Sequence, residues 1–270
     1  MKTWKLIVLM LCCSLIGVCG KYLYDYFSQS AENKEAYENI LDIGFSAEQD
    51  DPESEEETES AEGQSEVEAN DFDYNSILAI NSDCIGWIRI DGTDIDYPIV
   101  QAADNSYYLY HNFNQASAIC GAIFLDYRND IDLTREHLIL YGHQMKDGSM
   151  FKQLNGYKDR DFYENHPRIT LYLRNQKYNY DVVSVYVTDI ADSGSYYNYL
   201  HGDTREAQIE YLQKKMAAYQ LYDTGLTVTK EDELLSLSTC EYSSANGRLI
   251  VLARRSENEK ERVQRERSKE

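Results

Sequence analysis

The sequence predicts a mainly β domain, an antiparallel or mixed barrel of eight strands with one helix inserted between its later strands. Three observations lead to this prediction. Short apolar runs rich in β-branched and aromatic residues follow one another between residues 86 and 255. Turn residues separate these runs, and one longer stretch, residues 203–223, has apolar residues at helical spacing instead. Many short strands at modest spacing are typical of a barrel.

The predicted strands are short, and each ends at a turn or at a polar segment. An Asp-Gly pair at residues 91–92 separates the first two and is a common hairpin turn. The eight runs are GWIRI (86–90), DIDYPIV (94–100), GAIFLDY (121–127), HLILYGH (137–143), ITLYLRN (169–175), KYNYDVVSVYVTDI (177–190), ELLSLSTC (233–240) and RLIVLARR (248–255).

The segment 203–223 predicts the inserted helix. Leu212, Met216 and Tyr219 fall on one face of a helix there, and charged residues occupy the other faces. Thr204 stands at the start, where its hydroxyl can cap the first turn.

The N-terminus carries an apolar run, LIVLMLCCSLIGVCG, at residues 6–20, after Lys2 and Lys5. A run of this kind is an uncleaved signal anchor with its N-terminus in the cytoplasm, a cleaved signal peptide, or a lipoprotein signal ending at Cys19. No small-x-small cleavage site follows it cleanly, and Val18 stands where a lipoprotein signal has a small residue. We therefore expect an anchor, extended through the membrane interface by the aromatic residues of segment 22–27.

The composition divides the chain into four parts. Residues 1–27 are the membrane anchor, and residues 28–70 are a juxtamembrane segment followed by an acidic, disordered spacer. Residues 71–255 form the folded domain, which opens with a short helix, and residues 256–270 are a polar charged tail. The spacer, residues 46–70, holds eleven acidic side chains and no basic one, and the whole chain has a net charge of −21. This balance argues against a nucleic-acid partner, because phosphates require clustered Lys and Arg.

Three of the six cysteines, Cys84, Cys120 and Cys240, lie outside the apolar run. An exported domain with an odd number of cysteines keeps at least one free thiol. We expect Cys84 and Cys120 to be small core residues. The sequence has no C-x-x-C pair and no Cys/His spacing typical of zinc, so no metal site and no cofactor is predicted.

Three residues at strand ends form a candidate catalytic group. Cys240 ends an apolar run and precedes a polar loop, which suits either a buried thiol or an accessible nucleophile. His143 follows another apolar strand and suits a surface histidine or an acid/base group. Arg248 opens the next strand, eight residues after Cys240, so a hairpin would bring its guanidinium beside the thiol.

From about residue 74 to residue 255, these stretches resemble a class B sortase, a membrane-anchored cysteine transpeptidase of Gram-positive bacteria. The resemblance is carried by NSDCIGWIRIDGTDIDYPIVQAADNSYYLYHNF, GAIFLDYRN, YGHQMKDGSMF, HPRITL and LSTCEYSSANGRLIVLAR. It implies an eight-stranded sortase β-barrel with N-terminal helices and a helix between strands six and seven.

The resemblance also implies roles for single residues. Cys240 corresponds to the sortase nucleophile, His143 to its acid/base partner and Arg248 to its arginine. Ser238 and Glu241 fall at positions that line the class B substrate groove, although each also suits a structural role in the turn. No calcium requirement is implied.

The implied function is cleavage of a C-terminal sorting signal at a threonine and transfer of the acyl group to an amine of a peptidoglycan precursor. The expected partners are surface proteins that carry sorting signals, the lipid-linked peptidoglycan precursor and the cell membrane, with the domain outside the cell. The sequence also allows a pilin-polymerising sortase, a cysteine hydrolase of the papain type and a non-catalytic tethered β-barrel adhesin. The last two explain the pattern less well, because a papain-type cysteine stands at a helix start before its histidine and an adhesin requires no catalytic group.

Overall fold

The computed structural model describes residues 2–45, 72–130, 137–189, 204–243 and 246–256. By its contacts the chain divides into two compact units, residues 1–40 and 41–270. The predicted acidic spacer lies outside the described residues, as does the predicted tail from residue 257 onward.

Helix α1 (Lys2–Phe45) forms the first unit up to residue 40, and its last five residues, 41–45, belong to the second unit. The helix passes residue 27, where we expected the anchor to end, without a break. Within the described chain it is the single helix long and apolar enough to cross a membrane, with a mean hydropathy of 1.9 in its most apolar window. Length and composition therefore agree with the expected anchor.

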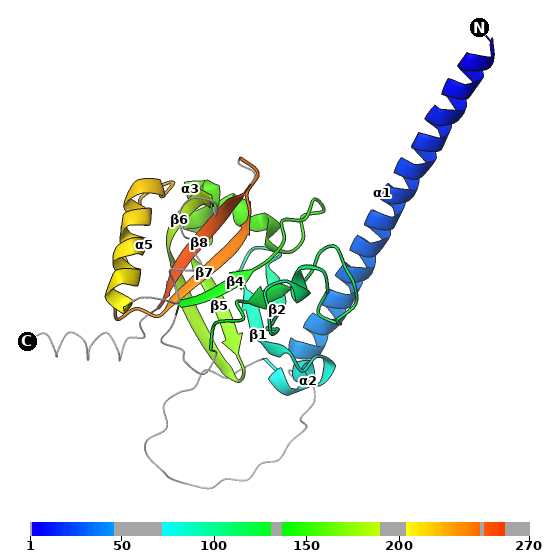
Figure 1. The fold of residues 1–270 in the computed structure, drawn as a ribbon. Coiled ribbons are helices and arrows are strands. Elements are labelled where there is room, and N and C mark those ends of the chain that lie inside the picture. Colours follow the sequence, from blue (N-terminus) through cyan, green and yellow to red (C-terminus); the bar gives the residue numbers. More distant parts are fainter. Residues whose placement is uncertain (1, 46–71, 131–136, 190–203, 244–245, 257–270) are drawn as a thin grey trace, which may run out of the picture. The chain divides into compact units, whose positions relative to one another are not determined.

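The second unit is a closed barrel of eight strands, as predicted (Figure 1). The strands are paired in the order β1-β2-β3-β4-β7-β8-β6-β5, and β5 pairs with β1 to close the barrel. Pairing is mixed, because β2–β3 and β4–β7 are parallel and the other neighbours are antiparallel. The strands are β1 (Cys84–Arg89), β2 (Asp96–Val100), β3 (Ile123–Leu125), β4 (His137–Tyr141), β5 (Arg168–Leu173), β6 (Gln176–Asp189), β7 (Leu234–Cys240) and β8 (Gly247–Arg255).

Short helices occupy the connections of the barrel. Helix α2 (Tyr74–Ile80) is the predicted opening helix, and the side chain of Asp73 caps it by accepting a hydrogen bond from the Ser76 N–H. The sequence does not predict η1 (Tyr107–Leu109), η2 (Phe151–Lys158) or α3 (Arg160–Asn165). These turns are too short to show a helical period.

Helix α5 (Arg205–Tyr219) lies between β6 and β7 in the chain, as predicted, and packs on the barrel beside β6 (Figure 1). Thr204 caps it, since its Oγ1 accepts a hydrogen bond from the Ala207 N–H at 3.4 Å. Its buried face is Ile209, Leu212 and Met216, which pack with β4, β6, β7 and β8 residues in one apolar cluster. Tyr219, which the helical spacing places on the same face as Leu212 and Met216, is 52% exposed where the helix ends.

Candidate active site

Cys240 is the last residue of β7, and the antiparallel register of the β7–β8 hairpin places it directly opposite Arg248. Residues directly opposite in an antiparallel pair point to the same face of the sheet. The hairpin therefore brings the thiol and the guanidinium to one side of the barrel wall, as the spacing of the two residues predicts.

His143 reaches the same place through the parallel pairing of β4 with β7. Tyr141 pairs with Ser238 at the end of β4, and the backbone contact continues because the Gly142 N–H donates to the Ser238 carbonyl at 3.3 Å. The hydroxyl of Thr239 then donates to the Gly142 carbonyl at 2.8 Å. The two strands therefore run side by side to their C-terminal ends, where His143 follows β4 and Cys240 ends β7.

Gly142 shows how tightly the C-terminal end of β4 is packed. A Cβ atom at this position would lie 2.5 Å from Cδ1 of Ile123 and 2.7 Å from the ring of Phe151. Only glycine fits between these side chains, so the chain can turn from β4 towards His143 without displacing the core.

The loop that contains η1 sets the orientation of the His143 ring. Nε2 donates a hydrogen bond to the carbonyl oxygen of Leu109 at 2.9 Å, which assigns the proton of the neutral ring to Nε2. Gly121, with a φ of +58°, passes so close that a Cβ atom there would lie 3.1 Å from Cδ2 of the ring. Nδ1 is left as the ring nitrogen that can accept a proton.

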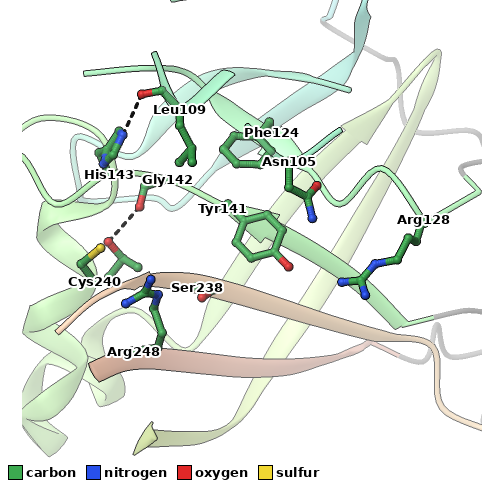
Figure 2. A pocket seen from close by; sticks show the side chains of 11 residues that line it. Asn105, Leu109, Phe124, Arg128, Tyr141, Gly142, His143, Ser238, Cys240 and Arg248 are labelled. Carbon is green, nitrogen blue, oxygen red and sulfur yellow. Dashed lines mark hydrogen bonds between the residues drawn. The ribbon is translucent and has the colours of Figure 1, made fainter. Parts of the chain in front are cut away.

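These residues line one cavity of about 250 Å³. In Figure 2, His143, Cys240 and Arg248 lie at one end of it, and Arg128 lies at the other. The cavity is therefore long enough to hold more than the reacting atoms. Its lining residues are Asn105, Leu109, Phe124, Arg128, Tyr141, Gly142, His143, Ser238, Thr239, Cys240 and Arg248.

The environment of Cys240 differs from that of the other two cysteines in the barrel. Cys240 is half-buried, whereas Cys84 and Cys120 are buried. Burial raises the pKa of Cys84 to about 12 and that of Cys120 to about 11. These two thiols stay protonated in the core, as expected, and only Cys240 opens on the cavity.

Among the described residues, no carboxylate compensates the charge of Arg248. Its Nη1 donates to the carbonyl of Gly247 at 2.9 Å, and it makes no ion pair with a carboxylate of the described residues. A cation without a counter-ion next to a thiol favours negative charge on the sulfur or on an oxygen attached to it.

Ser238 lies two residues before Cys240 on β7, and it lines the cavity as the alternation of a strand predicts. Glu241 lies outside the cavity lining. Its Oε1 pairs with Nζ of Lys158 at 2.7 Å, and its Oε2 accepts hydrogen bonds from the N–H and the hydroxyl of Ser243. These bonds lower the pKa of Glu241 to about 2. Here Glu241 holds the turn of the hairpin, and its contact with substrate stays a prediction.

Seven lining residues were not singled out from the sequence: Asn105, Leu109, Phe124, Arg128, Tyr141, Gly142 and Thr239. Tyr141 and Arg128 stand within the YGH and LDYRN stretches next to strand ends, and a search of all strand ends would have found them. Asn105 and Leu109 lie in a long connection without a periodic pattern. No local signal in the sequence could have placed them at this cavity.

Comparison with known proteins agrees with this geometry. A family model described as Sortase domain matches residues 88–256. Sortase B of Listeria monocytogenes is 36% identical over 181 residues, which cover 66% of this chain and 72% of that protein. Sortase B of Staphylococcus aureus is 34% identical over 185 residues, which cover 67% of this chain and 73% of that protein.

The solved structures give the same result. The crystal structure of sortase B from Bacillus anthracis in complex with AAEK1 superposes with a TM-score of 0.68 and 34% identity, covering 86% of this chain and 100% of that one. The family match spans more than half of the chain, and both relatives exceed 30% identity over most of their length. The chain therefore belongs to the sortase family of cell-wall-sorting transpeptidases, as a class B member.

Proposed function

We propose that this chain cleaves the C-terminal sorting signal of exported proteins at a threonine and joins the new carboxyl end to an amine of a peptidoglycan precursor. The observation that carries the proposal is the meeting of a thiol, an imidazole and a guanidinium in one cavity. The product is a surface protein bound covalently to the cell wall.

In the first step, the thiol proton of Cys240 passes to Nδ1 of His143, the resulting thiolate attacks the threonine carbonyl carbon, and the carbonyl oxygen becomes an oxyanion. The peptide N–H that follows Cys240 already donates to the Gly247 carbonyl at 2.9 Å. We therefore assign the stabilisation of the oxyanion to the guanidinium of Arg248. When the C–N bond breaks, His143 donates a proton to the leaving amine, and a thioester remains on Cys240.

In the second step, the amine of the wall precursor attacks the thioester carbon. His143 accepts a proton from the attacking nitrogen, and the C–S bond breaks to release Cys240 as a thiolate. Nδ1 suits both transfers, because Nε2 is held by the carbonyl of Leu109.

The N-terminal helix fits this reaction. We assign its apolar part to a single membrane span with the N-terminus in the cytoplasm and the barrel outside the cell. Exported substrates and lipid-linked wall precursors are both at the membrane. Tethering the enzyme there raises the effective concentration of each.

A transfer assay tests the proposal. The full chain in detergent is incubated with NPQTN-like, LPXTG-like and SPXTG-like peptides and a wall-type amine, and the products are identified by mass spectrometry. We expect an amide between the threonine carboxyl and the amine, which is lost in Cys240→Ala and retained in the matched variant Cys120→Ala. Free cleaved peptide without an amine adduct at any amine concentration would identify a hydrolase instead.

A further inference from the structure

The end of the cavity farthest from Cys240 is formed by three polar side chains, Asn105, Arg128 and Tyr141, which we call the polar wall (Figure 2). All three bind one carboxylate behind them, that of Asp126. The Asp126 side chain is fully buried, with 0% exposure, and does not itself line the cavity. Buried carboxylates are rare unless they are paired. Hydrogen bonds from the polar wall therefore keep the Asp126 carboxylate in position, and the same bonds fix the side chains of the wall.

The hydrogen bonds to Asp126 orient each member of the polar wall. Oδ2 accepts from the Tyr141 hydroxyl at 2.7 Å, from Nδ2 of Asn105 at 3.0 Å and from Nη2 of Arg128 at 2.7 Å. Oδ1 accepts from Nε of Arg128 at 2.9 Å, so the guanidinium is bound in a bidentate manner. The amide of Asn105 is fixed at its other atom too, because its Oδ1 accepts from the Tyr127 N–H at 3.0 Å.

This orientation decides what each group can offer to a ligand. The Tyr141 proton is directed to Asp126, so its oxygen meets a ligand as an acceptor. The Asn105 oxygen is directed to the backbone, so its amide meets a ligand through N–H. The wall therefore presents donors and an acceptor in a fixed arrangement that matches a peptide group or a side-chain amide.

The carboxylate of Asp126 balances the positive charge that Arg128 gives to the polar wall. Burial acts to raise the pKa of Asp126, but the hydrogen bonds from Arg128, Tyr141 and Asn105 outweigh it and lower the pKa to about 2. Asp126 is therefore ionised at neutral pH and compensates the charge of Arg128. Arg248 at the other end has no such counter-ion among the described residues.

We infer that Asp126 is a positioning residue that determines specificity, because it neutralises Arg128 and fixes the polar wall for an uncharged polar part of the substrate. The inference rests on the proposed function and names the substrate chemistry of the same cavity. An arginine without this carboxylate would attract an acidic peptide. An acidic side chain that enters the cavity loses its hydration, and the neutral wall offers no opposite charge to compensate that free-energy cost.

Two variants with opposite charge changes test the inference. Asp126→Asn leaves a net positive wall, and Arg128→Gln leaves a net negative one. Each is assayed with peptide pairs that carry Gln or Glu, in turn, at every position before the threonine, and the ratio of kcat/KM for Glu over Gln is measured. At the position that reaches the wall, we expect this ratio to rise about tenfold in Asp126→Asn and to fall about tenfold in Arg128→Gln.

The double variant Asp126→Asn/Arg128→Gln is neutral again and should return the ratio to within about threefold of the original. Misfolding cannot imitate this pattern. Loss of structure lowers kcat/KM for the Glu peptide and the Gln peptide alike, so it does not raise their ratio in one variant and lower it in the other. Alkylation of Cys240 by iodoacetamide should change by less than about twofold, since the reacting end of the cavity is not altered.

An unchanged ratio in folded variants at every peptide position would overturn the inference while leaving the transpeptidase proposal intact. If Asp126→Asn does not fold, Arg128→Gln decides the question, because the Arg128 side chain is 23% exposed and the Tyr141 hydroxyl and the Asn105 amide still bind the Asp126 carboxylate. Absence of transfer by the unaltered chain with every peptide would overturn the proposed function together with this inference.

Discussion

At the residue scale, the cavity combines side chains whose orientation is set by backbone groups. The His143 ring is fixed by the Leu109 carbonyl, and the Gln144 side chain ties the edge further by donating to the Cys240 carbonyl at 2.9 Å. These bonds hold the ring and the end of β7 in position before a substrate arrives, which lowers the cost of reaching the reactive arrangement.

The first prediction concerns His143. Replacement His143→Gln should lower kcat for transfer by about 10² to 10⁴-fold, because glutamine cannot exchange a proton with the amine. Thermal unfolding should shift little, since the side chain lies at the cavity and not in the core. Peptide-transfer kinetics and a thermal melt measure the two effects.

His166→Gln is the matched control. Nδ1 of His166 is also hydrogen-bonded to a backbone carbonyl, that of Asp91 at 2.8 Å, but His166 does not line the cavity. Equal losses in both variants, or activity within threefold of the original in His143→Gln, would contradict the role of His143 as the acid/base group.

How well single residues could be predicted depended on the distance between them in the chain. The pairing of Cys240 with Arg248 follows from a short hairpin, and the sequence predicts it directly. The place of His143 depends on the parallel pairing of β4 with β7, strands about a hundred residues apart, which no local pattern encodes. The family resemblance supplied that partner, and Asp126 was missed because its partners come from three separate segments.

At the scale of elements, the β7–β8 hairpin is tied to η2. Lys158 at the end of η2 bonds to Glu241, and the Glu241 side chain in turn holds Ser243 in the loop. The loop that follows the nucleophile is thereby joined to a different part of the barrel, which limits its movement beside the cavity.

The second prediction follows from this ion pair. The pKa of Glu241 is lowered to about 2 in the folded chain, whereas an unfolded glutamate titrates near about 4.3. The carboxylate therefore adds stability above the unfolded pKa, and this contribution is lost as the pH falls through the folded pKa. The stability difference between the original chain and Glu241→Gln should be constant from about pH 7 to 5 and vanish near about pH 2.

Urea unfolding at several pH values measures this difference. A double-mutant cycle with Lys158→Gln separates the ion pair from the bonds to Ser243. A difference that grows on acidification would show that the ion pair does not form in solution.

The third prediction concerns helix α5. Leu212 has 0% exposure in the cluster under the helix, so Leu212→Ala should lower the free energy of unfolding by about 3 kcal/mol. Leu221, two residues after the helix, is 43% exposed, and Leu221→Ala should cost less than about 1 kcal/mol. Denaturant unfolding compares the two, and equal losses would show that α5 does not pack on the barrel as described.

Helix α5 also shows where pattern analysis is weak. Leu212, Met216 and Tyr219 are spaced for one face, and two of them are buried, but the helix ends at Tyr219 and leaves that ring exposed. The buried position at the other end is Ile209, one turn before Leu212. The spacing predicts the face, whereas the surface beneath the helix decides which residues of the face are covered.

At the scale of the whole molecule, the chain joins an apolar helix to a catalytic barrel. By their internal contacts, the helix and the barrel form two compact units, and the division lies between residues 40 and 41. Residues 41–45 belong to the barrel unit, where Phe45 packs against Phe72, Trp87 and Tyr172. A truncation that spares these residues should therefore leave the barrel folded.

The fourth prediction uses such a truncation. The full chain should stay with membranes after an alkaline wash, and protease added outside spheroplasts should digest its barrel. A chain without residues 2–27 should fold and transfer peptides in solution at an unchanged rate, because the removed segment does not line the cavity. Protection of the barrel from external protease would contradict the proposed topology.

The most direct test of the central claim is detection of the acyl-enzyme. The chain is mixed with a sorting peptide that it cleaves, without an amine, quenched in acid and analysed by intact mass and peptide mapping. The account predicts a mass increase equal to the peptide up to its threonine, located on Cys240 and removed by hydroxylamine. Cleavage without any adduct on Cys240, or an adduct on another residue, would contradict it.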